Sequence, residues 1–155
     1  MPDSTFGFEK PEQSAGFLLW QTTTIWQRLI REALEPYNII HPQFVVMAIL
    51  LWFREHNQET NQITIANWSK LDKMTVSRSL KKLADSGFVV RSEHDKDPRA
   101  KSVQLTDAGC AFIKTLVPII ENIDAQFFGR LTSTNEQCLV AILDTLTGFS
   151  HENSK

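Results

Sequence analysis

Residues 72–90 read DKMTVSRSLKKLADSGFVV, and this stretch decides the fold. Asp72 is a good N-cap, and the apolar residues Val76, Leu80 and Leu83 recur at helical spacing, so a helix is predicted over residues 73–86. Gly87 ends this helix in the usual C-terminal way, and the apolar run that follows it predicts a strand over residues 88–90. We therefore expect a helix that leads directly into a strand.

The residues on either side complete a recognisable order of elements. Residues 62–69 favour a short helix capped by Thr60 or Asn61, although the β-branched residues 63–65 are also compatible with a short strand. After the strand comes a charged turn, and residues 102–105 alternate enough to form a return strand. The order short helix, tight turn, helix, strand, hairpin, strand is typical of a helix-turn-helix followed by a wing.

Further helices are expected outside this module. Helical periodicity predicts helices over residues 14–35, 41–56 and 107–129, and a last helix that opens at Thr132 or Thr134. Pro118 is expected to kink the third of these. The predicted fold class is mainly α with a small two- or three-stranded β-wing, a winged helix-turn-helix with helical extensions. Residues 1–13 are expected to form a disordered tail.

The face of the 73–86 helix opposite its apolar stripe is polar and mostly basic. A helix of this width fits the major groove of DNA, where Arg78 would bond guanine and Lys81 and Lys82 would meet phosphates. The residues expected to contact DNA from this helix are Lys73, Thr75, Ser77, Arg78, Lys81 and Lys82. A solvated amphipathic helix is the alternative interpretation.

Charge is unevenly distributed along the 155 residues. The net charge is −2, but residues 70–101 hold nine Lys/Arg and five Asp/Glu, a local net of +4, which leaves −6 for the rest. A basic middle in an acidic chain indicates a polyanion-binding module on an acidic carrier.

The predicted hairpin carries a second candidate contact. Asp97 and Arg99 lie two residues apart in the turn, so the carboxylate can orient the guanidinium toward a minor groove. Lys101 adds a further positive charge at the wing. A local surface salt bridge is the alternative.

With these residues in view, the chain resembles the multiple antibiotic resistance regulator (MarR) family. The family's wing pattern, Asp-x-Arg followed by Leu-Thr-x-x-Gly, is present as Asp97, Arg99, Leu105, Thr106 and Gly109. Residues 74–78 and 83–90 also resemble the family's recognition helix and first wing strand, whereas Trp68-Ser69 departs from its small and apolar pattern.

The resemblance implies a homodimeric regulator of transcription, a repressor released by a ligand, bound to a pseudo-palindromic operator. It implies one MarR-like domain over residues 14–155, with residues 40–105 as the DNA-binding module and residues 14–36 and 106–149 as the helical dimerisation region. Small aromatic or lipophilic effectors bind such proteins between these two parts. The residues that would line such a pocket here are Trp20, Trp26, His41 and Phe44.

Several other classes of function are not expected. The sequence contains no Gly-rich phosphate loop, nucleophile elbow or metal-ligand spacing, so we expect no enzyme, cofactor or metal. No apolar run reaches membrane-spanning length and no signal peptide is evident, so we expect a cytoplasmic protein. Cys110 and Cys138 are expected to be packing residues. A winged-helix protein-interaction module and a cysteine-based redox regulator remain the alternatives.

Overall fold

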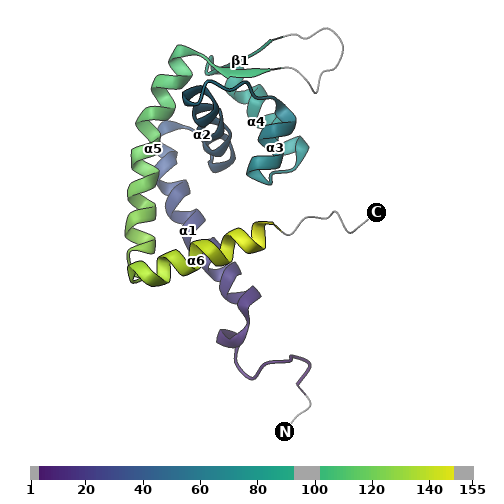
Figure 1. Cartoon of the computed structure of the whole chain (residues 1–155), viewed down its shortest axis with the longest axis vertical. Helices are drawn as coiled ribbons and strands as arrows, with labels where there is room; N and C mark the ends of the chain where they lie inside the picture. Colours follow the sequence, from purple (N-terminus) through teal and green to yellow (C-terminus); the bar gives the residue numbers. More distant parts are fainter. Residues whose placement is uncertain (1–3, 93–101, 149–155) are drawn as a thin grey trace. The chain divides into compact units, whose positions relative to one another are not determined.

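The computed structural model describes residues 4–92 and 102–148 of the chain. Over these residues it contains six α-helices and one two-stranded antiparallel sheet, which confirms the predicted mainly α winged helix-turn-helix (Figure 1). The chain divides into two compact units, residues 1–120 and residues 121–155, and each is described by itself.

After a short 3-10 helix (Pro11–Gln13), the first unit continues with two long helices joined by a tight turn. α1 (Ala15–Leu34) starts at Ser14, whose hydroxyl accepts a hydrogen bond from the Phe17 amide at 3.1 Å. A 3-10 turn (Glu35–Tyr37) separates it from α2 (His41–Glu55). α2 is the central helix of this unit, because it contributes these buried side chains to the core: Phe44, Val46, Met47, Leu50, Leu51 and Phe53.

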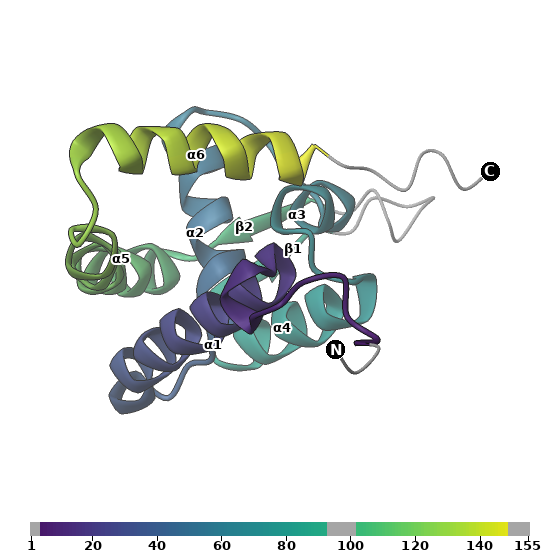
Figure 2. The same ribbon diagram turned by 90° about the horizontal axis from the view of Figure 1, so that it is seen from below.

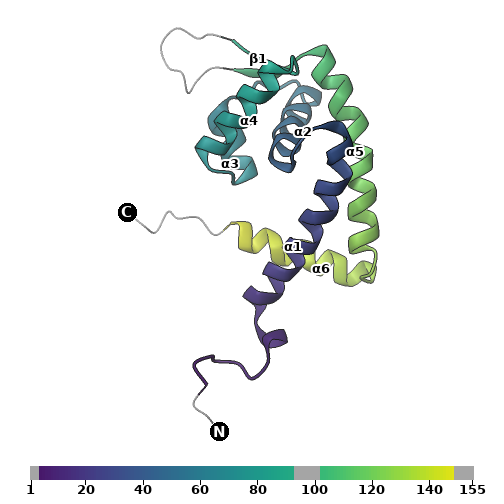
Figure 3. The ribbon, with the colours of Figure 1, turned by 180° about the vertical axis from the view of Figure 1, so that it is seen from behind.

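The helix-turn-helix follows α2. α3 (Gln62–Ser69) and α4 (Lys73–Asp85) lie side by side in Figures 1 and 3. Asn61 caps α3 and Asp72 caps α4, each through a side-chain oxygen that accepts a backbone amide, and Lys70 ends α3 in the left-handed conformation at φ 61°. The pair packs against α2 through four fully or nearly fully buried side chains: Ile65, Val76, Leu80 and Leu83.

The wing sheet is formed by β1 (Val89–Arg91) and β2 (Val103–Leu105), which pair antiparallel. β2 also packs against α2, and Figure 2 shows the two next to each other. An isolated bridge between Asn61 and Ser102 joins the start of α3 to the end of the hairpin. The base of the wing is therefore anchored both to the central helix and to the helix-turn-helix.

A compact joint connects the wing to α5 (Asp107–Phe128). The Thr106 hydroxyl donates a hydrogen bond to the carbonyl oxygen of Gly87 at 2.7 Å and accepts one from the Gly109 amide at 3.0 Å. A Cβ on Gly109 would overlap the carbonyl oxygen of Phe88, so only glycine fits there without movement of the backbone. The Leu-Thr-x-x-Gly pattern thus has a physical reason: it fastens α5 to the end of α4.

An aromatic cluster covers the outer side of α2 and α3. The rings of Trp52 and His56 stack with centroids 3.8 Å apart, and the His56 ring contacts the Trp52 carbonyl oxygen through Nδ1 at 2.7 Å. Trp68 packs against Trp52 and Phe53 at centroid distances of 4.9 Å and 4.7 Å. Trp68, which departs from the small residues expected there, therefore joins α3 to α2.

The second unit contains the end of α5 and the whole of α6 (Ser133–Thr147). α6 is capped by Thr132, whose hydroxyl accepts a hydrogen bond from the Asn135 amide at 3.2 Å. None of its residues, all of which the structure describes, is buried, although Val140, Ile142 and Leu146 are large and apolar.

The helix predictions are accurate to one residue at either end for the ranges 14–35, 41–56, 62–69, 73–86 and 107–129. Thr132 is the N-cap of the last helix, so that alternative is the correct one, and the strand alternative for residues 63–65 is wrong. The first wing strand begins one residue later than predicted. α5 continues through Pro118.

Within the described residues, no single helix is long and apolar enough to cross a membrane. The segments 15–37 and 41–55 meet that criterion only when they are taken together, and the chain bends by 81° between them.

Candidate nucleic-acid interface

The outward face of α4 is basic and accessible. Lys73, Arg78, Lys81 and Lys82 are exposed, and Met74 on the same face is 69 % exposed. The helix therefore presents long cationic side chains on one side while its apolar side fills the core, which is the arrangement that a groove-binding helix requires.

Thr75 and Ser77, the two predicted hydroxyl contacts on α4, are half-buried. The Thr75 hydroxyl donates a hydrogen bond to Asp72 Oδ2 at 2.7 Å, and the Thr75 amide donates to Asp72 Oδ1 at 2.8 Å. These two bonds, the hydroxyl first, hold the pKa of the Asp72 carboxyl below its ordinary value. Thr75 is thus part of the helix cap, and its hydroxyl already uses its proton in the hydrogen bond to Asp72.

Arg91, at the end of β1, is an additional cation that the sequence-based prediction missed. Its Nη2 donates a long hydrogen bond of 3.4 Å to the carbonyl oxygen of Ser77, so the wing base places an exposed guanidinium beside α4. The signal was present in the sequence, since Arg91 is one of the basic residues counted between residues 70 and 101. It was missed because nothing local to a strand end indicates which helix it faces.

The three wing residues predicted to contact DNA, Asp97, Arg99 and Lys101, lie outside the described residues. Their roles stay predictions. The described part of the hairpin ends at Ser92 and Ser102, where the Ser92 amide donates to the Ser102 carbonyl oxygen at 3.0 Å.

Three of the four residues predicted to line an effector pocket share one cavity in the first unit. Trp20, Trp26 and His41 line a hollow of about 770 Å³, and the Trp26 and His41 rings meet edge to face with centroids 5.2 Å apart. The fourth, Phe44, is buried in the core and does not line this hollow. The other lining residues include two cations from α1, Arg28 and Arg31.

The remaining candidate chemistry is sparse. Cys110 is half-buried on α5, and Cys138 is exposed on α6, both as free thiols. Among residues 4–92 and 102–148, no group of three or more His, Cys, Asp or Glu side chains is placed to hold a metal ion.

Comparisons with known proteins also indicate a winged-helix regulator of transcription. Residues 35–123 match the family model described as "ArnR1-like, winged-helix domain". The uncharacterized HTH-type transcriptional regulator YdcH of Bacillus subtilis is 36 % identical over 121 residues, which cover 78 % of this chain and 82 % of the relative.

Solved structures share the fold. The Bordetella bronchiseptica protein BpsR, whose DNA binding is regulated by 6-hydroxynicotinic acid, superposes with a TM-score of 0.80 at 21 % identity, over 93 % of this chain and 100 % of that one. A mutant MarR from Escherichia coli complexed with operator DNA superposes with a TM-score of 0.72 at 22 % identity, over 84 % and 91 %. The matched winged-helix domain and the B. subtilis relative show that the chain belongs to the MarR family of winged-helix transcriptional regulators.

Proposed function

We propose that this regulator is a repressor that binds a pseudo-palindromic duplex as a homodimer and is released by a small aromatic or lipophilic effector. In this proposal α4 of each subunit enters the major groove. The observation that carries it is the outward face of α4, where four exposed cations precede a single acidic residue, Asp85, at the far end. A regulator of transcription acts where the DNA is, and we accordingly assign it to the cytoplasm.

Different positions on α4 have different expected roles. Lys81 and Lys82 lie in the second half of the helix, where the groove wall is phosphate, and contribute affinity that depends on salt. Arg78 lies nearer the N-terminus, where side chains reach base edges, and contributes sequence preference. Lys73 and Ser77 flank this set. Thr75 contributes only as a hydrogen-bond acceptor, because its hydroxyl already donates to Asp72 Oδ2. Arg99, oriented by Asp97, and Lys101 contact the DNA from the wing.

Exposed apolar residues support the homodimer. Leu19 and Trp20 on α1 are 51 % and 70 % exposed, and Val140, Ile142 and Leu146 on α6 are each more than half exposed. Apolar surface of this extent on helices outside the DNA-binding module favours a second copy as its cover.

The hollow beside α1 supports an effector site. Its volume suits a small molecule, Trp20 and Trp26 offer aromatic surface, and Arg28 and Arg31 can neutralise an acid. In BpsR a small aromatic acid regulates DNA binding, and 6-hydroxynicotinic acid is therefore the first probe to try here. DNA affinity that does not change with this probe or with a panel of other aromatic acids would contradict release by that class of effector.

The decisive experiment is a salt series. Duplexes selected from random DNA and unselected duplexes are titrated with wild type and with Lys81→Ala, Lys82→Ala and Arg78→Ala. Each lysine variant should weaken binding to both duplexes alike and flatten the salt slope by about one counterion per subunit. Arg78→Ala should cost about 1–3 kcal/mol per half-site on the selected duplex only.

Lys114→Ala on α5 is the matched control, an exposed lysine outside the proposed surface that should change neither slope nor preference. Wild type without any salt slope would contradict DNA binding and favour a protein-interaction module. If Arg78→Ala loses the same affinity for both duplexes, the proposal of DNA binding still holds, but Arg78 does not read bases.

The homodimer is tested by sedimentation. The intact chain should sediment at twice its 17.7 kDa mass, and Ile142→Lys with Leu146→Lys should shift it toward the monomer because charge is added to an apolar contact. Asp144→Lys, which adds the same sign of charge on the other side of α6, is the control. A compact monomer of the unaltered chain at micromolar concentration would contradict the proposal.

A further inference from the structure

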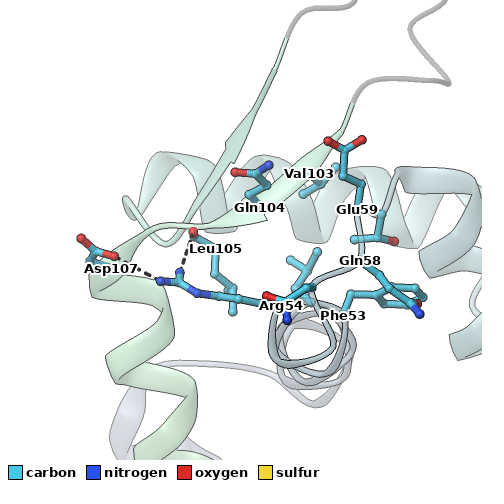
Figure 4. A pocket seen from close by; sticks show the side chains of 11 residues that line it. Phe53, Arg54, Gln58, Glu59, Val103, Gln104, Leu105 and Asp107 are labelled. Atoms are coloured by element: carbon cyan, nitrogen blue, oxygen red, sulfur yellow. Dashed lines mark hydrogen bonds and ion pairs between the residues drawn. The ribbon is translucent and has the colours of Figure 1, made fainter.

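A groove lies behind the wing, away from the hollow beside α1. It has a volume of about 500 Å³ and is bounded by the end of α2, the loop that follows it, β2 and the first residue of α5 (Figure 4). The apolar part of its lining is Leu50, Phe53, Val103 and Leu105, and the polar part is Arg54, Asn57, Gln58, Glu59, Thr60, Gln104 and Asp107.

Thr60 is the first sign that the groove holds a molecule. Its side chain lines the groove, the residue is only 6 % exposed, and its hydroxyl has no hydrogen-bond partner among the described residues. Its backbone carbonyl oxygen, in contrast, accepts the Val103 amide at 2.9 Å. A buried hydroxyl without a partner is costly, and valine would fill the same volume without that cost. The hydroxyl oxygen is covered in this rotamer, so it would reach a polar atom in the groove after rotation about the Cα–Cβ bond.

Arg54 is the second sign. Its Nη1 donates to the Leu105 carbonyl oxygen at 3.2 Å, and its Nη2 contacts Asp107 Oδ1 at 3.3 Å. These two contacts use two of the five N–H groups of the guanidinium. The ion pair between Arg54 and Asp107 is long, and the Asp107 carboxylate is fully exposed. The pair is therefore weak, and Arg54 can exchange Asp107 for another partner.

The signs of the charges narrow the class of occupant. The lining carries one cation, Arg54, and two carboxylates, Glu59 and Asp107, and Figure 4 shows Arg54 with Asp107 at one end and Glu59 toward the other. A simple anion would meet two like charges, and a simple cation would meet the guanidinium. A molecule that carries both signs a few ångströms apart matches the lining best.

We propose that this groove binds an α-amino acid with an uncharged side chain. The ligand carboxylate accepts from Arg54 in place of Asp107, and the ligand ammonium donates to the Asp107 carboxylate that is set free. After rotation about its Cα–Cβ bond the Thr60 hydroxyl provides a third polar contact, and the ligand side chain packs on Phe53 and Leu105. Neither the arginine nor the threonine hydroxyl belongs to the effector hollow beside α1.

Binding at this groove would act on the wing. β2 forms one wall, and the same strand pairs with β1 and is held by the Thr60 carbonyl oxygen, so an occupant contacts the base of the hairpin directly. A change in DNA affinity on binding is the consequence, and this part of the inference rests on the proposed function.

Calorimetry without DNA tests the site itself. The amino acids with uncharged side chains are titrated one at a time into the full chain. Each is compared with two analogues, one that lacks the ammonium group and one that lacks the carboxylate. For leucine these are 4-methylpentanoate and 3-methylbutylamine. At least one amino acid should bind at least tenfold more tightly than either analogue. No binding of any of them at millimolar concentration, or equal binding of the analogues, would overturn the proposal.

Two variants localise the binding. Arg54→Gln should weaken it at least tenfold, and Thr60→Val should weaken it several-fold while raising the melting temperature of the ligand-free protein. The second variant keeps the test sharp if the first is unstable, since it removes only a hydroxyl. Arg130→Gln, an exposed arginine of the second unit, is the control. Undiminished binding by Thr60→Val and Arg54→Gln would overturn the assignment to this groove.

A duplex titration with and without the bound amino acid tests the link to the wing. A changed DNA affinity that needs several-fold more amino acid in Thr60→Val, and at least tenfold more in Arg54→Gln, supports the link. An amino acid that binds but leaves DNA affinity unchanged overturns the link alone, and a protein that binds amino acid but no DNA overturns the proposed function alone.

Discussion

Helices α4 and α6 have similar lengths, 13 and 15 residues, and both begin at a side-chain cap. Both also carry apolar residues at helical spacing. In α4 these residues are covered by the first unit, where Val76 and Leu80 are completely buried. In α6 the corresponding residues stay open to solvent, with Ile142 at 56 % and Leu146 at 57 % exposure.

The difference teaches that an apolar stripe shows where a helix can pack but not what covers it. For α4 the cover comes from α2, α3 and β1 of the same unit. For α6 the second unit contains no other complete helix among the described residues, and the proposed second subunit would supply the cover. The stability of the first unit should therefore respond to single substitutions in a way that the second unit does not.

The largest expected difference is in core truncation. Leu80→Ala removes a fully buried side chain and should lower the free energy of unfolding by about 2–5 kcal/mol at every protein concentration. Leu146→Ala on α6 should instead change how the unfolding midpoint depends on concentration, because its cover would come from a second copy. Denaturant titrations at several concentrations measure both. Equal, concentration-independent costs would break the comparison.

The next largest difference is in the cost of replacing a glycine that lies close to the backbone of another segment. Gly109→Ala should cost roughly 1–3 kcal/mol or more, because its Cβ overlaps the Phe88 carbonyl oxygen and the joint must open. Gly148→Ala at the end of α6 is the matched substitution, since its Cβ would lie 3.4 Å from the nearest atom, the Thr145 carbonyl oxygen, at ordinary contact distance. Thermal melts compare the two, and a tolerated Gly109→Ala would show that the joint is not tight.

The two N-caps give the smallest and most specific difference. The hydroxyl and amide of Thr75 lower the pKa of the Asp72 carboxyl below its ordinary value, so its contribution to stability is present above the unfolded-state pKa. It is lost as the pH falls through the lower, folded-state pKa. Asp72→Asn should therefore flatten the acid side of the melting profile slightly.

Thr132→Ala removes the cap of α6, which does not titrate, and should cost about 0.5–2 kcal/mol at every pH. Melting temperatures between pH 3 and pH 7 compare the two caps. A pH-dependent cost of Thr132→Ala, or an unchanged acid limb in Asp72→Asn, would contradict this assignment.

Local chemistry explains which features could be predicted from the sequence. Caps such as Asn61, Asp72 and Thr132 act within three residues of themselves, so the helix starts could be placed well. Arg54, by contrast, meets Leu105 from 51 residues away, and nothing in the spacing of either residue indicates that contact.

The same distinction between local and long-range contacts applies to the candidate site. The cationic face of α4 follows from helical periodicity alone, and it is exposed as expected. The engagement of the Thr75 hydroxyl by Asp72 and the approach of Arg91 to Ser77 depend on rotamers and on a strand that returns to the helix. Such contacts are decided by tertiary packing, which a single sequence does not display.

The positions of the tryptophans have a spectroscopic consequence. All four lie in the first unit, at residues 20, 26, 52 and 68, and two of them form the cluster with the stacked His56 ring. Intrinsic tryptophan fluorescence will therefore report the unfolding of the helix-turn-helix and α1 but not that of α6. Circular dichroism, in contrast, records the loss of every helix. Unfolding curves from the two signals should separate wherever α6 melts on its own, so the protein carries a built-in optical reporter that distinguishes its two units.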